Sequence, residues 1–393
     1  MTDQGPWPLW TDEHPSEPTV PLSLPGTVSG PSCPACGAPA SASASYCETC
    51  GAPLTPTADP PAGPRQVPVT EASAQTKRLG THASAATVCG FCGGSVDTDG
   101  YCQTCGAKAP TLREHFEAVP AAWVGGVCDR GISHHRNEDG MALWADAGGL
   151  PRAVLVVCDG VSSSTDSDVA SLVAAERARD VLAVTRPQGL GVTASQDAAM
   201  TAAIVSAVAQ ANDAVVAHTA PESTNAASAT IALAVVEGGT IHVANVGDSR
   251  VYWFDDERSL LLTVDDSVAQ EFIAAGLSRA EAEALPQAHA ITRWLGRDSD
   301  DAVPRTQAWR PGTRGWLLVC SDGLWNYASE PADLAVQLRA ALVGGDEPVV
   351  VARRLVAWAN AQGGRDNITV ALARCEASLD GAAAVVASPL ITS

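Results

Sequence analysis

Two short apolar stretches, each ending at an Asp-Gly pair, constrain the fold of this chain most strongly. The first, residues 153–158, leads into Asp159, and the second, residues 316–320, leads into Asp322. Short valine-rich runs bounded by turn residues are typical of buried strands, because a helix usually needs more residues. Asp366 stands just before a third run of this kind. Three carboxylates at the ends of rigid strands predict one converged site for hard cations.

The composition indicates a folded protein that binds neither nucleic acid nor an anionic membrane. Apolar residues make up 46% of the 393 residues, which suffices for a large core. The net charge is −20, whereas binding to phosphate groups needs clustered Lys and Arg. No apolar run approaches the roughly 18 to 20 residues of a membrane span, and no secretion signal opens the chain. We therefore expect a cytoplasmic protein.

The N-terminal part holds eight of the twelve cysteines, in four Cys-x-x-Cys pairs. They form two repeated units of four thiolates, and each unit suits one tetrahedral, structural zinc ion. Each unit is too short for an apolar core, so zinc would supply its folding energy. A redox role is the alternative, but it requires a thioredoxin-like strand and helix that this region lacks. The predicted zinc ligands are Cys33, Cys36, Cys47, Cys50, Cys89, Cys92, Cys102 and Cys105.

Composition divides the chain into six parts. They are a disordered segment at 1–30, a zinc ribbon at 31–55, a linker at 56–86, a second ribbon at 87–110, a large domain at 120–376 and a tail at 377–393. In the large domain, clustered strands and paired helices favour packed layers of antiparallel sheet and helix, an α+β fold. Further strands are expected at 123–128, 141–145, 230–236, 240–246 and 250–254, and helices at 167–184, 197–218, 266–275, 278–285, 331–342 and 348–361.

Six motifs in the large domain resemble those of the metal-dependent Ser/Thr protein phosphatases of the 2C type, the PPM family. They are RGISHHRNED at 130–139, VCDG at 157–160, ANVGDSR at 244–250, TRWLG at 292–296, SDG at 321–323 and DN at 366–367. The resemblance implies a four-layer α-β-β-α sandwich. It also implies hydrolysis of phosphoserine and phosphothreonine by a metal-activated water at a dinuclear Mn²⁺ or Mg²⁺ centre. The substrates would be phosphoproteins made by a bacterial Ser/Thr kinase.

The resemblance also implies roles for individual residues. Asp159 would bridge two ions and the Gly160 carbonyl would bind the second, while Asp322 and Asp366 would complete the first. Glu138 and Asp139 would act through metal-bound water, and Asp248 would help to hold a third, weaker ion. His134 and Arg136 would act on the substrate phosphate. The chemistry agrees, because hard cations prefer carboxylate and carbonyl oxygen.

Several positions depart from the family pattern. His134 stands where the family usually has an arginine, which grips phosphate more strongly than histidine does. Ser162 and Ser163 replace usual glycines, and Asp266 replaces a usual histidine. These departures leave an alternative open: a weakly active or inactive phosphatase-like protein that recruits a protein partner through its zinc ribbons. Arg293 is expected to pair within the fold.

Overall fold

The structure, a computed structural model, describes residues 94–97, 100–106, 111, 113–146 and 151–376. The first zinc ribbon, the linker and both terminal segments therefore lie outside the described residues, as do residues 87–93 and 107–110 of the second ribbon. So do six of the eight predicted zinc ligands, Cys33, Cys36, Cys47, Cys50, Cys89 and Cys92.

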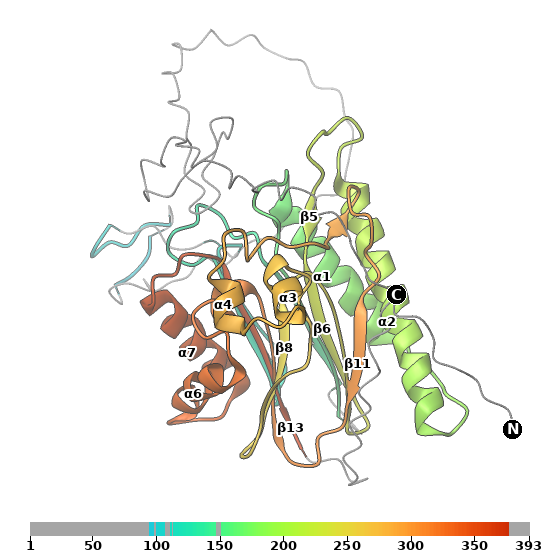
Figure 1. The fold of residues 1–393 in the computed structure, drawn as a ribbon. Coiled ribbons are helices and arrows are strands. Elements are labelled where there is room, and N and C mark those ends of the chain that lie inside the picture. Colours follow the sequence, from blue (N-terminus) through green and yellow to red (C-terminus); the bar gives the residue numbers. More distant parts are fainter. Residues whose placement is uncertain (1–93, 98–99, 107–110, 112, 147–150, 377–393) are drawn as a thin grey trace, which may run out of the picture. The chain divides into compact units, whose positions relative to one another are not determined.

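Two antiparallel sheets form the centre of the large domain (Figure 1). One sheet has the strand order β1-β2-β13-β12-β8-β9, with β1 at His115–Ala121, β2 at Val124–Asp129, β13 at Ile368–Cys375, β12 at Gly315–Cys320, β8 at Arg250–Phe254 and β9 at Ser259–Leu261. The other has the order β11-β7-β6-β4-β3, with β11 at Arg305–Trp309, β7 at Thr240–Val246, β6 at Ile231–Glu237, β4 at Arg152–Cys158 and β3 at Gly140–Ala145. The short strands β5 (Ser228–Ala229) and β10 (Leu295–Gly296) pair with each other.

Helices cover the outer face of each sheet (Figure 1). Helices α1 (Ser167–Val184) and α2 (Thr193–His218) pack on the five-stranded sheet, and α6 (Pro331–Leu342) and α7 (Pro348–Ala361) pack on the six-stranded sheet. The remaining helices are short: α3 (Val268–Ala274), α4 (Arg279–Glu283) and α5 (Asp322–Trp325). The predicted sandwich of two antiparallel sheets flanked by helices is thus confirmed.

Strand β4 is apolar from Ala153 to Cys158 because both of its faces pack in a core. Its residues alternate between two cores, because successive side chains of a strand point to opposite faces. Leu155 and Val157 lie in the core between the sheets, while Val154 and Val156 lie in the core under α1 and α2. From Ala153 to Cys158 both faces are buried by apolar neighbours, and the polar residues stand at the two ends, Arg152 at the start of the strand and Asp159 directly after it.

Helix α2 is long and apolar enough to cross a membrane by length and composition, with a mean hydropathy of 1.3. It contains no unbroken apolar run of the length of a membrane span, because Thr, Ser, Gln, Asn and Asp interrupt its alanines and valines. In the fold, Ile204, Val208 and Val215 of α2 are buried against α1 and the five-stranded sheet.

Three of the four edge strands of the two large sheets were not predicted from the sequence, β3 being the exception. Strands β1, β9 and β11 lie at sheet edges, and their residues are partly exposed. Strand β1 begins at His115, ahead of the predicted start of the domain at residue 120, and its sequence contains Pro120, which is tolerated at an edge. Helices α3 and α4 are shorter than the predicted 266–275 and 278–285.

Candidate active site

Acidic residues converge at one end of the two sheets. The register of β3 and β4 brings Asp139 next to Asp159 at this end of the five-stranded sheet. In the six-stranded sheet, the register of β8 and β12 brings Asp248 and Asp322 to the same end of the strands, and Asp366 lies just before β13. Five carboxylates that the sequence predicted as metal ligands therefore belong to one centre.

Asp139 is held with one oxygen bonded and one without a partner. The hydroxyls of Ser321 and Thr369 each donate to Oδ2 of Asp139 at 2.7 Å. Its Oδ1 is buried and has no hydrogen-bond partner. The side chain is 0% exposed, and burial raises the pKa of Asp139 to about 7. A buried acceptor without a donor is costly, so this oxygen is suited to a cation.

The other carboxyl groups raise one another's pKa. Burial and then Asp139 raise the pKa of Asp159 well above its usual value. Burial and then Asp366 do the same to the pKa of Asp322, although a hydrogen bond from Asp159 opposes this shift. The pKa of Asp248 rises to about 7, mainly through burial. The centre thus concentrates negative charge that the protein itself does not neutralise.

These observations fit a divalent cation. Oδ1 of Asp322, like that of Asp139, is buried without a hydrogen-bond partner. All candidate ligands offer oxygen, which Mn²⁺ and Mg²⁺ prefer. Within the described residues, however, no three acidic, histidine or cysteine side chains already have the spacing of ligands around one ion. Binding would therefore draw the carboxylates closer together, which their mutual repulsion now opposes.

Glu138 faces a polar cluster beside the centre. Its Oε1 accepts hydrogen bonds from Ser167 and from Arg136, the latter at 2.7 Å. Ser162 donates to its Oε2 at 3.0 Å, and Nδ1 of His134 lies 3.6 Å from the same oxygen. Burial would raise the pKa of Glu138, but hydrogen bonds from His134, Ser167 and Arg136 lower it to about 2. Ser162, which replaces a usual family glycine, thus donates a hydrogen bond to this carboxylate.

His134 and Arg136 are both engaged with carboxylates. Nε2 of His134 lies 3.2 Å from Oδ1 of Asp366, and its hydrogen bond with Glu138 raises the pKa of His134 against the effect of burial. Arg136 is half-exposed, and its guanidinium also lies 3.5 Å from Asp168. The structure therefore places His134 between two acidic residues, whereas Arg136 reaches the centre only through Glu138.

Backbone packing fixes the loops that carry these residues. A Cβ on Gly160 would lie 2.5 Å from the Ser167 carbonyl and 2.7 Å from that of Glu138, so only glycine fits. The Asn367 side chain accepts from the Glu138 N–H at 2.7 Å and donates to the Arg130 carbonyl at 2.7 Å. Sequence reasoning missed this role of Asn367, and also that of Ser321 and Thr369. The first two lie inside the quoted motifs, which was the available signal.

Asp266, which replaces a usual histidine, is a structural anchor. Its side chain is fully buried and pairs with Arg293 at 3.2 Å and Arg305 at 2.9 Å. It also accepts from the Gly247 N–H at 3.1 Å, directly before Asp248. The prediction that Arg293 pairs within the fold is confirmed.

The charge of the centre leads to a pH prediction. The pKa of Asp139 is about 7 in the folded protein and about 3.9 in an unfolded chain. Its contribution to stability is therefore fully present below about pH 4 and is lost as the pH rises through about 7. We expect the metal-free protein to lose stability over this interval relative to Asp139→Asn, which cannot ionise. The measurement is the difference in melting temperature between the two proteins from pH 4 to 8.

Groups that do not interact with Asp139 cancel in this comparison, because both proteins contain them. Asp159 and Asp322 do not cancel, because Asp139 raises their pKa, and its replacement relieves the same repulsion and adds to the difference in the same direction. The pKa of His242 is lowered to about 4, mainly by burial, so its contribution is lost as the pH falls. Glu138, with a pKa of about 2, changes below the interval. If Asp139→Asn is not the more stable protein at pH 8, by roughly 5 °C or more, the carboxylate is not an uncompensated charge.

Carboxylates gathered at one end of two antiparallel sheets are suited to holding divalent cations. The comparisons with known proteins give the family. The chain belongs to the protein phosphatase 2C family, whose profile matches residues 131–358.

Named relatives agree with this assignment. The chain is 29% identical over 246 residues to the serine/threonine phosphatase stp of Listeria innocua, covering 62% of this chain and 92% of that protein. It is 37% identical over 142 residues to protein phosphatase PhpP of Streptococcus pneumoniae, covering 36% of this chain and 54% of that protein. The chain is thus a serine/threonine phosphatase of the PPM family, and its substrates are phosphoproteins.

Solved structures share the fold. The PPM Ser-Thr phosphatase MsPP from Mycobacterium smegmatis, solved in complex with cacodylate, has a TM-score of 0.50 and 28% identity, covering 64% of this chain and 97% of that one. The serine/threonine phosphatase of S. agalactiae has a TM-score of 0.54 at 24% identity, covering 66% and 100%. The latter likeness concerns the fold alone.

Proposed function

We propose that this phosphatase depends on Mn²⁺ or Mg²⁺, held by Asp159, the Gly160 carbonyl, Asp322 and Asp366, with Asp248 and Asp139 beside them. The observation that carries the proposal is the pair of buried carboxylate oxygens without partners, on Asp139 and Asp322. When bound, divalent cations would lower the pKa of water and stabilise the negative charge that develops on the phosphoryl group.

The chain's own residues would then set the geometry. Ser321 and Thr369 hold Oδ2 of Asp139, so that its other oxygen faces the centre. Asn367 holds the loop that carries Glu138. Arg136 is half-exposed on the rim, and an arginine can bind a substrate phosphate with two parallel hydrogen bonds. We assign it that role because its side chain is 49% exposed, whereas that of His134 is 13% exposed between Glu138 and Asp366.

The test is phosphate release from a phosphothreonine peptide in excess chelator and after addition of Mn²⁺ or Mg²⁺. Activity should appear only with the cation. Equal activity in excess chelator would overturn cation dependence. Replacing Arg136 with lysine should raise KM more than it lowers kcat, because lysine keeps the charge but not the paired donors.

We further propose that the N-terminal cysteines hold two structural zinc ions. The described part of the second ribbon supports this. The Thr104 N–H donates to Sγ of Cys102 at 3.4 Å, which is how backbone amides stabilise a thiolate. A short hairpin pairs Val96 with Cys102, and a Cβ on Gly94 would lie 3.1 Å from the same sulfur. The segment that follows Cys92 therefore packs against Cys102.

The zinc proposal predicts a stoichiometry. Protein purified under reducing conditions should contain about two zinc ions per chain, because each unit supplies four thiolates. Replacing Cys33 and Cys36 with serine should halve this number and leave phosphatase activity unchanged. Elemental analysis of both proteins provides the measurement, and zinc near zero in the wild type would contradict the proposal.

The sequence also supports proposals about the substrates, the cellular location and a protein partner. We propose that the substrates are proteins phosphorylated by a bacterial Ser/Thr kinase in the cytoplasm, and that the ribbons bind a protein partner. The acidic net charge of −20 supports a protein substrate over nucleic acid. Closed four-cysteine sites leave no ligand position for a substrate, which favours a recruiting role for the ribbons.

A further inference from the structure

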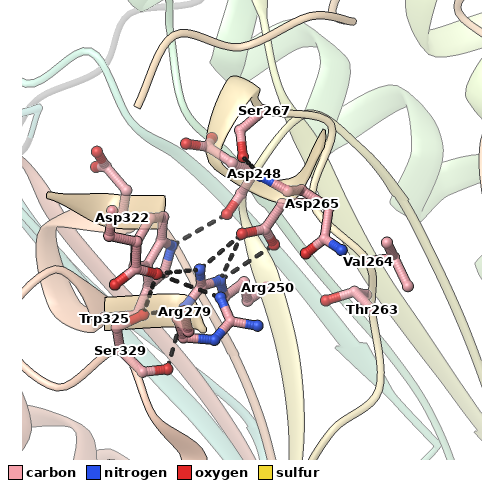
Figure 2. Close-up of polar contacts among 12 residues, drawn as sticks. Asp248, Arg250, Thr263, Val264, Asp265, Ser267, Arg279, Asp322, Trp325 and Ser329 are labelled. Atoms are coloured by element: carbon pink, nitrogen blue, oxygen red, sulfur yellow. Dashed lines mark hydrogen bonds and ion pairs between the residues drawn. The ribbon is translucent and has the colours of Figure 1, made fainter. Parts of the chain in front are cut away.

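A buried arginine outside the predicted ligand set links the centre to the segment at residues 266–292, here called the α3–α4 segment. Arg250 is 1% exposed, and its Nη2 pairs with Oδ2 of Asp265 at 2.6 Å (Figure 2). The same nitrogen lies 3.4 Å from Oε1 of Glu283, at the end of α4. Its Nη1 donates to the Ser329 hydroxyl at 3.1 Å.

The other side of this guanidinium touches the helix that begins at a predicted metal ligand. Cζ of Arg250 lies 3.5 Å from the centre of a Trp325 ring, a distance at which cation and aromatic ring attract each other. Trp325 belongs to α5, which begins at Asp322. Its indole N–H donates to the Asp248 carbonyl at 3.0 Å (Figure 2). Trp325 therefore connects Arg250 to two acidic residues, to Asp248 through a hydrogen bond and to Asp322 through helix α5.

The α3–α4 segment is fastened to this unit at further points. Ser329 donates to Oε1 of Glu283 at 2.5 Å. The His289 ring lies 6.0 Å from that of Trp325. At its base, the Asp266 N–H donates to the Gly247 carbonyl at 2.9 Å, directly before Asp248. Contacts at both ends and in the middle make the segment and the Asp248 turn one packed body.

We propose that Arg250 and Glu283 are positioning residues that couple the α3–α4 segment to the half of the centre formed by Asp248 and Asp322. This inference rests on the proposed cation site. A cation that draws Asp248 and Asp322 together would move Trp325 and Arg250 with them. Glu283 would transmit this movement from Arg250 to helix α4. Coupling of this kind is reciprocal, so fixing the segment would also tighten cation binding.

The test uses Mn²⁺ alone, without turnover, and Glu283→Ala. Glu283 is partly exposed and Asp265 still pairs with Arg250, so the variant is expected to fold. Glu271→Ala is the matched control, because Glu271 is an exposed residue of α3 in the same segment. Amide hydrogen exchange of residues 268–290 is measured with and without Mn²⁺, and Mn²⁺ affinity is measured by calorimetry.

In the wild type and in Glu271→Ala, Mn²⁺ should slow exchange in the segment by roughly three- to tenfold. In Glu283→Ala this Mn²⁺ effect should vanish, and Mn²⁺ should bind more weakly by a similar factor. A purely structural role would instead speed exchange equally with and without Mn²⁺. Mn²⁺ binding without slower exchange in the wild type would overturn the coupling alone. Absence of Mn²⁺ binding would overturn the proposed centre as well.

Discussion

Replacing Asp159 with asparagine is expected to lower Mn²⁺-dependent hydrolysis of a phosphothreonine peptide by at least about a hundredfold. Asp159 lies in the acidic centre beside Asp139, and the carboxylates of Asp139, Asp322, Asp366 and Asp248 all raise its pKa, in addition to burial. Asparagine keeps the shape but removes the charge that a cation needs. Rates at saturating Mn²⁺ provide the measurement.

The same substitution should not harm the fold. Removing one buried negative charge relieves repulsion, so metal-free Asp159→Asn should unfold at a temperature equal to or above that of the wild type. Asp180→Asn is the control, since Asp180 is exposed on α1 and, within the part of the chain that the structure describes, pairs with its neighbour Arg179. A lower melting temperature for Asp159→Asn would mean that lost activity reflects a damaged fold.

Replacing Arg250 with methionine is expected to lower the free energy of unfolding by about 3 to 5 kcal/mol. The reason is that Asp265 is 3% exposed and would keep a buried charge without its partner. Trp325 and Ser329 would lose contacts at the same time. Urea unfolding of metal-free protein gives the measurement.

Two further variants separate the causes of this loss. Arg353→Met removes an exposed ion pair with Glu117 and should cost only about 0 to 1 kcal/mol. The double variant Arg250→Met with Asp265→Leu should recover much of the loss, because no buried charge then remains unpaired. If Arg250→Met costs no more than Arg353→Met, the network around Arg250 does not stabilise the fold.

Most inner elements could be predicted from the sequence for physical reasons. Strand β4 is buried on both faces, so its apolar run and its end at Asp159 mark its extent. Helices α6 and α7 begin at Pro331 and Pro348, a residue favoured in the first turn. Edge strands such as β11 carry exposed polar residues and lack such a pattern.

The acidic centre was predictable only in part. Its carboxylates lie close to strand ends and in motifs, so the sequence alone marks Asp159, Asp322 and Asp366. The placement of His134 between Glu138 and Asp366 depends on contacts between distant segments. The Arg250 network likewise joins strand β8 with α4 and α5 across the fold, and no local pattern indicates such a junction.

Calorimetric titration of Mn²⁺ into wild-type protein freed of Mn²⁺ and Mg²⁺, and into Asp159→Asn prepared in the same way, tests the central claim most directly. The zinc ions that we propose should remain bound throughout, so both proteins are prepared identically. We expect saturable binding to the wild type and its loss in Asp159→Asn. Equal Mn²⁺ binding by the two proteins would show that the cation does not occupy the centre around Asp159.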